Sequence, residues 1–408
     1  MAMARVLYTV GTIVGPETRS SSIPKFQYAN YLSEAHETTI LAKEEIKEEK
    51  IRKQAETIRT SPGSGLLGTL IFPMFITFHV ISSWGSYDLF ATDDWGVSVL
   101  PFIILSRFST NWVIFCDDTP EGQRIRRRRN GIDWSLETVY LELLDTVSRV
   151  SFRFADEIIV TDGSRILPSD KTTLVKGGVD CKFISDVESN SEYKINCYQN
   201  NNPESVQAPI RIIYAGNMYI HRGIDIILDA VKESESEYKL ILIGPPPERG
   251  GEEVMSEFRN YYSKSFTQLV DEYSEKIEYK GFLSDHRDVI EEMIRADIGL
   301  CILPYDRQLP HYYTSYIIKI FEYMSTGTSI LATKTRATED LLTPDQLIEE
   351  NDSTILANKI DNFCSNTELR RSCCENNLNN SEKHCWDHLW REFDEALNPL
   401  LETTQKRN

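Results

Sequence analysis

Short apolar segments alternate with helical patterns along the whole chain, in two separate series. The first series has strand-like segments at 5–10, 87–92, 111–116, 156–161 and 171–178, with a charged helical pattern after the first strand to about residue 60. The second has strand-like segments at 210–216, 239–245, 276–282, 297–305 and 328–333, and predicted helices over 223–233 and 317–324. This alternation favours βαβ units with parallel strands. The predicted fold class is therefore α/β, with one doubly wound sheet for each series.

The stretch between the two series is rich in Asn, Ser and Pro and poor in large apolar residues. Such a composition is typical of a linker. We therefore predict an N-terminal domain at 1–195, a linker at 196–209 and a C-terminal domain at 210–375. A length of 408 residues agrees with two domains, because single hydrophobic cores usually stop growing below that size.

The last segment, 376–408, is predicted to be a C-terminal helix that packs back toward the N-terminal domain. It has large apolar residues three and four positions apart, at Trp386, Trp390, Phe393 and Leu397. That spacing places them on one helical face. Core packing explains the pattern without a ligand.

Acidic residues outnumber basic ones by 62 to 44, which gives a formal charge of −18. A surface of this charge repels polyphosphate, so nucleic acid is not an expected partner. The eight cysteines form no C-x-x-C pair and have no histidines at zinc-ligand spacing. We therefore predict a reduced, cytoplasmic chain without a metal site. The N-terminus lacks the long apolar core of a signal peptide and is predicted to be a first strand.

The segment from Leu66 to Trp84 is nearly as long and apolar as a membrane span, but it contains Gly68, Pro73 and His79. Three interpretations are open. A buried helix is the one we favour, peripheral docking on a bilayer is the second, and a spanning helix is the third, which would divide the N-terminal domain.

A possible phosphate site follows the first strand of the second series. The strand ends at Gly216, and a helix begins near Arg222 and Gly223. Ligands of open α/β sheets bind at this edge, where helix-start amides and a guanidinium can bind a diphosphate. The alternative is a glycine turn with a solvated arginine.

The predicted helix at 317–324 places Lys319, Glu322 and Tyr323 within one turn, and Gly327 is where it should end. A lysine can neutralise phosphate, and a nearby carboxylate can accept hydrogen bonds from the two hydroxyls of a ribose. The alternative is an exposed ion pair between Lys319 and Glu322.

The order of these motifs resembles the retaining group 1 (glycogen synthase-like) glycosyltransferases of the GT-B fold. The resemblance is carried by a strand, glycine, loop and Arg-Gly, then GF, an ADIGL strand, and KIFEYMSTGTSILAT, over about 205–345. Looser echoes occur in ADEIIVTDGSRILP and LVKGGVDCKFISD. The resemblance implies two Rossmann-like domains facing across a cleft and a nucleoside diphosphate sugar donor bound by the C-terminal domain. It also implies no metal or other cofactor and an acceptor that is a glycan, a glycolipid or a lipid-linked molecule.

The same resemblance assigns roles to individual residues. Arg222 takes the place of the diphosphate-binding lysine of the family, and Glu322 that of the carboxylate that binds ribose. Leu283, directly after Gly-Phe, would lie beside the base. Gly11 and Gly15 lie in the first strand-to-helix loop, where the donor phosphate would approach the backbone closely.

The chain departs from the family pattern at three places. Thr314 replaces the first acid of the E-x7-E pair, and Lys319 is expected to compensate for it. Asn217 stands where a diphosphate-binding arginine often occurs. Asp117 follows a strand at a place where relatives have a histidine near the sugar, and we expect it to orient the acceptor hydroxyl or to accept its proton.

Two acidic pairs and one basic run complete the candidate residues. The pairs Asp93-Asp94 and Asp117-Asp118 lack the alternate spacing of a D-x-D metal motif and are interpreted as loop acids. The run from Arg124 to Arg129 is suited to a phosphate-bearing acceptor or an anionic membrane, and the alternative is a solvated helical face.

The sequence therefore predicts a cytoplasmic glycosyltransferase that moves a sugar from a nucleoside diphosphate donor. A peripheral position on the inner face of the cell membrane is the location that we leave open. Lys319, Glu322 and Asp117 are the predicted catalytic residues. A non-catalytic nucleotide-sugar-binding protein and a GT-B sugar-nucleotide epimerase are the alternatives. A Rossmann dehydrogenase is excluded, because no G-x-G-x-x-G follows a strand with an acid about twenty residues later.

Overall fold

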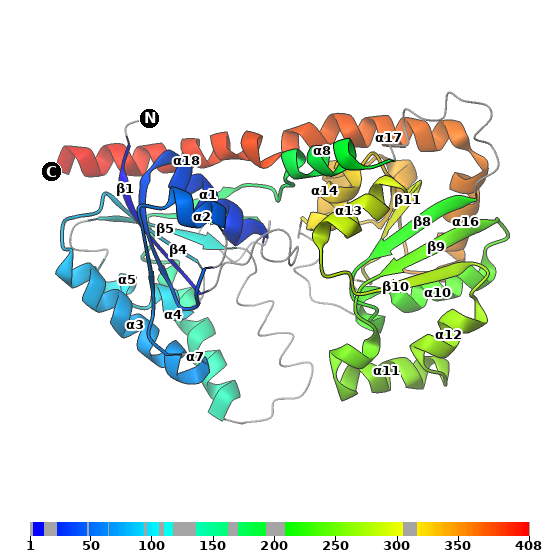
Figure 1. Cartoon of the computed structure of the whole chain (residues 1–408), viewed down its shortest axis with the longest axis horizontal. Helices are drawn as coiled ribbons and strands as arrows, with labels where there is room; N and C mark the ends of the chain where they lie inside the picture. The colour runs from blue at the N-terminus through cyan, green and yellow to red at the C-terminus, as the bar shows by residue number, and fades with distance from the viewer. Residues whose placement is uncertain are drawn as a thin grey trace. The chain divides into compact units, whose positions relative to one another are not determined.

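The computed structural model describes ten stretches of the chain, 3–11, 23–46, 49–63, 65–93, 96–105, 110–116, 136–161, 170–192, 209–304 and 316–407. The chain forms two compact units (Figure 1). Unit 1 consists of Met1–Gly177 and Trp386–Asn408, and unit 2 of Gly178–Cys385.

Unit 1 is built on a sheet of seven parallel strands in the order β3-β2-β1-β4-β5-β6-β7. The strands are β1 (Arg5–Val10), β2 (Glu37–Ala42), β3 (Thr57–Thr60), β4 (Leu89–Asp93), β5 (Asn111–Cys116), β6 (Glu157–Val160) and β7 (Thr172–Leu174). The prediction of a charged helical stretch to residue 60 is wrong, because β2 and β3 lie within it. In β2, five of six residues are buried, and such a strand pairs on both sides in the sheet.

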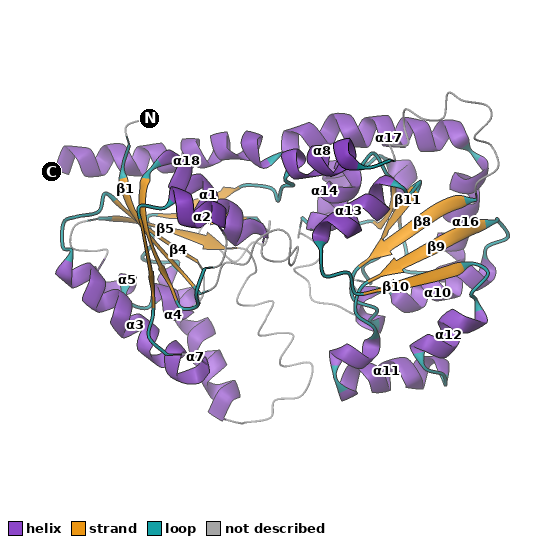
Figure 2. Cartoon of the chain, in the orientation of Figure 1, coloured by secondary structure: helices purple, strands orange, loops and turns teal. Residues whose placement is uncertain are grey.

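The helices of unit 1 cover both faces of this sheet (Figure 2). They are α1 (Ile23–Ala35), α2 (Glu49–Gln54), α3 (Gly65–Ser82), α4 (Gly96–Val99), α5 (Phe102–Leu105), α7 (Leu136–Ser151) and α18 (Trp386–Arg407). Helices α3, α4, α5 and α7 share one core with Trp112 and Ile114 of β5. On the other face, Tyr28 of α1 stacks on Phe115 of β5 and contacts Phe393 of α18. The apolar face predicted for α18 is thus confirmed as core, with Trp386, Phe393 and Leu397 at most 2% exposed.

Unit 2 is built on six parallel strands in the order β10-β9-β8-β11-β12-β13. They are β8 (Ile210–Ala215), β9 (Tyr238–Ile243), β10 (Ile277–Gly281), β11 (Ile298–Cys301), β12 (Ser329–Thr333) and β13 (Leu347–Ile348). The helices are α8 (Cys181–Asn190), α10 (Ile224–Glu233), α11 (Glu252–Tyr262), α12 (Phe266–Glu272), α13 (His286–Ile294), α14 (Ile318–Ser325), α15 (Arg336–Leu341), α16 (Ser353–Ser365) and α17 (Thr367–Ser381). Side chains of β8 alternate between two cores, with Ile212 and Tyr214 in one and Ile213 and Ala215 in the other. The sheet is therefore buried on both faces, as expected of a doubly wound sheet.

Both sheets have the same strand order, in which the chain first adds strands on one side and then returns to add them on the other. The side on which new strands are added changes between β1 and β4 in unit 1 and between β8 and β11 in unit 2. Ligands of such sheets bind at this switch point, beyond the carboxyl ends of the strands. The topology thus selects one edge of each sheet as the place to look for a site.

The chain passes between the units at 177/178 and at 385/386, whereas the sequence placed the boundaries at 195/196 and 375/376. Helix α8 belongs to unit 2 because it packs on α13, where the Phe183 ring lies parallel to that of His286. Helix α17 also belongs to unit 2, and α18 to unit 1. The predicted linker, apart from residue 209, lies outside the described residues.

A disulfide joins the two ends of unit 2. Cys181 and Cys385 are bonded, with Cα atoms 5.5 Å apart, and the Val179 N–H donates to the His384 carbonyl at 2.9 Å. The prediction of a fully reduced chain is wrong for this pair. The two cysteines are 204 residues apart, so their spacing gave no sign of the bond.

Helix α3 is buried on one face only. Phe72, Ile76 and Val80 enter the core and are at most 2% exposed. The opposite face carries exposed large apolar residues, at Leu67, Leu70, Met74, Phe78 and Ile81. None of the helices in the described part of the chain is long and apolar enough to cross a bilayer. In the structure, α3 has one buried face and one exposed apolar face.

Candidate functional site

The carboxyl end of β8 leads into a loop that lies against the loop after β9. The Gly216 N–H donates to the Ile243 carbonyl at 2.8 Å. A Cβ on Gly244 would lie only 1.9 Å from the Gly216 carbonyl oxygen, so the two backbones touch where side chains would not fit. The Tyr214 hydroxyl donates to the Asn217 carbonyl at 3.0 Å and holds the loop in place.

Gly223 ends this loop and begins α10. Its φ of 79° is left-handed, and a Cβ there would lie 2.8 Å from the Ile302 side chain, just beyond β11. A glycine is therefore required for the helix to begin this close to β11. As a result the positive end of the α10 dipole lies at the switch point between β8 and β11.

Lys319 of α14 extends to the same place. Its Nζ lies 4.2 Å from the centroid of the Tyr214 ring, and a Cβ on Gly216 would lie 2.9 Å from that nitrogen. Burial lowers the pKa of Lys319, Cys301 raises it, and Arg222 lowers it further. Arg222 thus adds a second positive charge to the electrostatic surroundings of Lys319.

Cys301, the last residue of β11, is influenced by both cations. Burial raises the pKa of its thiol, while Lys319 and Arg222 lower it. Two cations therefore act on one point at the carboxyl edge of the sheet. Like charges placed together favour an anionic ligand between them.

Glu322 is one helical turn beyond Lys319 and is 3% exposed. Its Oε1 lies 2.9 Å from His286 Nε2. The Lys319 ammonium lies over the Tyr214 ring. The alternative of an exposed ion pair between Lys319 and Glu322 is thus wrong. Tyr323, by contrast, is buried against the sheet. Its hydroxyl accepts a hydrogen bond from the Ala215 N–H and donates one to the Ile213 carbonyl.

The structure brings most of the predicted site residues in unit 2 together at one sheet edge. These are Gly216, Asn217, Arg222, Gly223, Lys319 and Glu322. Leu283 follows β10 and packs against the core that contains Phe321. Sequence reasoning missed Tyr214, Cys301 and His286, whose roles come from contacts between distant elements. One local pattern could have pointed to His286. Asp285, shortly after Gly-Phe, is a typical N-cap residue, and it places His286 at the start of a helix.

Other predicted residues are elsewhere. Gly11 is at the end of β1 in unit 1, and its N–H donates to Asp93 at 3.0 Å. Asp93 is not a loop residue as predicted but the last residue of β4, 1% exposed, and Lys25 lies 3.3 Å from it. Gly15, Asp94, Asp117, Asp118, Thr314 and the run Arg124–Arg129 lie outside the described residues. Within the described stretches, no three His, Cys, Asp or Glu side chains are grouped so that they could hold a metal ion.

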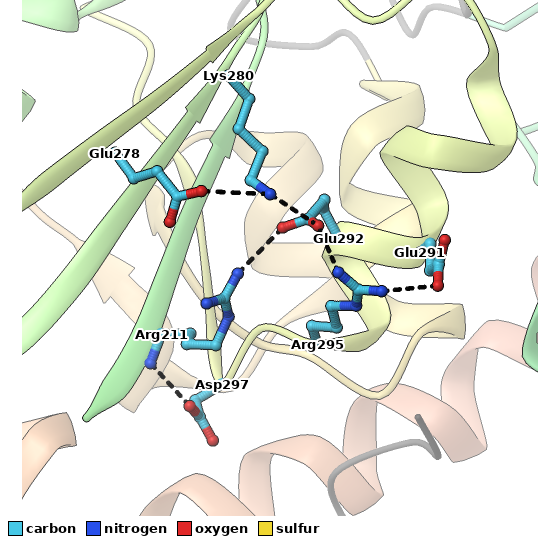
Figure 3. A network of polar contacts seen from close by, with 7 residues as sticks. All are labelled: Arg211, Glu278, Lys280, Glu291, Glu292, Arg295 and Asp297. Atoms are coloured by element: carbon cyan, nitrogen blue, oxygen red, sulfur yellow. Dashed lines mark hydrogen bonds and ion pairs between the residues drawn. The ribbon is translucent and has the colours of Figure 1, made fainter. Parts of the chain in front are cut away.

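A larger ionic network lies near the amino ends of β8 and β11, away from this site (Figure 3). Glu292 of α13, 6% exposed, accepts from Arg211, Lys280 and Arg295 at 2.9–3.0 Å. The Asp297 carboxylate accepts from the Arg211 N–H at 2.8 Å. Each charge is already matched within the protein, so we interpret this network as structural.

Comparison with known proteins gives a family match for most of unit 2. Residues 209–366 match the family described as Glycosyl transferases group 1, a stretch that runs from the residue before β8 to the one after α16. This part of the chain is similar to the group 1 glycosyltransferases. No match was found among curated protein sequences.

Solved structures show that the chain has the GT-B fold, with two Rossmann-like units. A sucrose-phosphate synthase from Thermosynechococcus elongatus superposes with a TM-score of 0.69 at 16% identity, over 98% of this chain and 100% of that one. HepE from Anabaena, in complex with UDP, has a TM-score of 0.65 at 15% identity, over 97% and 100%. The lipopolysaccharide outer core galactosyltransferase WaaB has a TM-score of 0.60 at 11% identity, over 97% and 99%.

Proposed function

We propose that this chain is a glycosyltransferase that moves a sugar from a nucleoside diphosphate sugar to a hydroxyl group of a glycan, glycolipid or lipid-linked acceptor, with retention at the anomeric carbon. The observation that carries the proposal is the position of the Lys319 ammonium, over the Tyr214 ring and next to Gly216 at the carboxyl end of β8, with Arg222 in the loop that follows that strand. A diphosphate is the part of such a donor that two adjacent cations would bind.

The other groups of the site suit the rest of the donor. The amides at the start of α10 face the same edge and add a partial positive charge for the phosphates. Glu322 is buried one turn beyond Lys319, where its carboxylate would accept hydrogen bonds from the ribose hydroxyls. Leu283, on the loop after β10, offers an apolar contact for the base.

Uridine nucleotides are the first donors to test. HepE has been crystallised with UDP, with UDP and glucose, and with UDP-glucose. The likeness of this chain to HepE lies in the fold alone. It therefore suggests an order of testing and does not identify the donor.

Catalysis would be mainly electrostatic. As the bond between sugar and phosphate breaks, negative charge grows on the leaving diphosphate, and Lys319 and Arg222 would stabilise it. Two protein cations at this point can take the role that a metal ion has in other glycosyltransferases. We therefore infer that turnover needs no metal.

The exposed face of α3 supports an acceptor presented at a lipid surface. The five exposed apolar residues of this face extend over about 20 Å of helix, and α3 contains no Asp, Glu, Lys or Arg. Other exposed apolar residues occur on helices that share a core with α3, at Ile104 of α5 and at Val139, Leu143 and Val150 of α7. An apolar face without charges is suited to the acyl boundary of a bilayer. A position on the inner face of the cell membrane is the location that goes with this proposal.

The test is a panel of nucleoside diphosphate sugars incubated with the full chain and simple sugar acceptors, with and without EDTA. We expect release of nucleoside diphosphate for at least one donor, unchanged by EDTA, and NMR of the new glycoside should show the anomeric configuration of the donor. An inverted product would contradict retention. Nucleotide binding without any release would favour the non-catalytic alternative.

A further inference from the structure

His286 is held at a fixed place beside Glu322. It is the first residue of α13, and Asp285 caps that helix by accepting from the Arg287 N–H at 2.8 Å. The imidazole lies nearly parallel to the Phe183 ring of α8, with centroids 5.9 Å apart and an interplanar angle of 7°. Helix α13 and the aromatic contact together fix the ring, whose Nε2 points to Glu322 Oε1.

His286 and Glu322 are both buried, so the hydrogen bond between them matters for the stability of the Glu322 charge. The side chains of His286 and Glu322 are 10% and 4% exposed. A carboxylate this deep is costly unless it is hydrogen-bonded. Among the described residues, His286 is the side chain that bonds the Glu322 carboxylate. One oxygen of Glu322 is thus oriented by the protein, and lone pairs remain for a ligand.

We propose that His286 is a positioning residue that fixes the Glu322 carboxylate for the ribose, so that the site distinguishes ribonucleotides from 2′-deoxyribonucleotides. The inference rests on the proposed function, in which Glu322 binds the ribose hydroxyls. A carboxylate held by His286 cannot turn to compensate for a missing hydroxyl group. A carboxylate free to rotate can move its hydrogen bonds to the one that remains. Discrimination therefore depends on the contact from His286 and not on Glu322 alone.

Two substitutions separate the hydrogen bond from the packing. His286→Phe keeps a ring against Phe183 and removes the donor. His286→Gln places an uncharged amide nitrogen at the reach of Nε2 and keeps a donor that does not titrate. His388→Gln, at an exposed position of α18 in unit 1, is the matched control.

The experiment measures the dissociation constants of UDP and 2′-deoxy-UDP by calorimetry. If UDP does not bind, the adenosine and guanosine pairs replace it. The full chain and the His388→Gln control should bind the ribonucleotide about tenfold or more tightly than the deoxy form, as expected for loss of a hydrogen bond to a charged group. In His286→Phe that ratio should fall below about threefold, and in His286→Gln it should be largely restored.

A pH series provides a readout that a purely structural role would not change. Burial lowers the pKa of His286, but Glu322 and Asp285 raise it by more than burial lowers it. The pKa of His286 therefore lies above the usual value for histidine. The charges that act on the His286 imidazole are thus those of Glu322 in α14 and Asp285 just before α13. Helix α8 contributes the uncharged Phe183 ring, and the Arg287 guanidinium lies over that phenyl ring. Because the pKa is raised on folding, the charged contact is fully present below about pH 6.5 and is lost as the pH rises through the raised value. The advantage of the full chain over His286→Gln in UDP affinity should decline over that range.

The outcomes separate the two proposals. If no nucleoside diphosphate binds the full chain, the proposed function fails. If the ribonucleotide binds but His286→Phe and His286→Gln both keep the ratio of the full chain, His286 has no positioning role and only the further inference fails. Thermal unfolding of each variant shows whether the fold is kept, and His286→Gln keeps the test decisive if His286→Phe unfolds.

Discussion

Glu322 and Glu292 are both buried carboxylates in unit 2, and their surroundings differ. Glu292 accepts from three cationic side chains, so its charge is matched within the protein (Figure 3). Glu322 is bonded by His286, and its remaining lone pairs are free of any partner among the described residues. This difference supports a structural role for Glu292 and agrees with the binding role that we propose for Glu322.

The network around Glu292 gives a prediction for stability. Glu292→Gln removes the charge that Arg211, Lys280 and Arg295 share, and we expect the free energy of unfolding to fall by about 2–3 kcal/mol in urea denaturation. Glu339→Gln is the control, because Glu339 is 44% exposed in its pair with Lys334 and should lose less than about 0.5 kcal/mol. Equal losses in the two variants would show that the network adds nothing to the fold.

At the residue scale, the sequence predicts the groups that belong to a local motif. Lys319 and Glu322 share one helical turn, and Arg222 and Gly223 mark a helix start after a strand. Their partners could not be predicted in this way. His286 is 36 residues from Glu322, and only the packing of α13 against α14 brings the two together.

At the scale of elements, strands buried on both sides are the best predicted. The predicted bounds of β5 are those of the structure, and the helix predicted at 223–233 begins one residue later, at Ile224. Strand β2 was missed because the charged segments around it repeat like an exposed helix, although α2 accounts for only Glu49–Gln54. Strand β13 has two residues, too few for a period of two to be visible.

The exposed face of α3 gives a prediction at this scale. Replacing Met74 and Phe78, which are 71% and 74% exposed, by serine should leave the core intact and reduce binding to phospholipid vesicles at least about fivefold in sedimentation assays. Apolar area removed from water is the driving force, so neutral vesicles should bind as well as anionic ones.

The control for this experiment is Met3→Ser, which changes a methionine of unit 1 that is 67% exposed but lies outside α3. Its vesicle binding should equal that of the unchanged chain. If Met74→Ser/Phe78→Ser binds vesicles normally, or if the two changes instead abolish self-association seen by ultracentrifugation, the lipid surface is the wrong partner for this face.

At the scale of the whole molecule, the α/β class and the presence of two doubly wound sheets were predicted correctly, and the GT-B fold followed from the resemblance. The points where the chain changes unit were not predicted, because they depend on where α8 and α17 pack. Both cysteines of the Cys181–Cys385 disulfide lie near points where the chain passes between units. Cys385 is the last residue before the crossing at 385/386, and Cys181 is four residues after Gly177, where the other crossing occurs. A covalent bond between the ends of unit 2 restricts its unfolded chain, which generally stabilises a fold.

The central claim is that the carboxyl edge of the unit 2 sheet binds a nucleoside diphosphate through Lys319 and its neighbours. Calorimetric titration of the full chain with UDP, then GDP and ADP, tests this claim most directly when Lys319→Met is compared with Lys334→Met. Lys334 is a partly exposed lysine of unit 2 that pairs with Glu339 and Glu349, so its loss should leave the affinity unchanged. We predict a loss of affinity of about tenfold to a hundredfold for Lys319→Met, because a cation that contacts phosphate is removed. If a nucleotide binds the unchanged chain and Lys319→Met binds it with the same affinity, then Lys319 does not take part in nucleoside diphosphate binding.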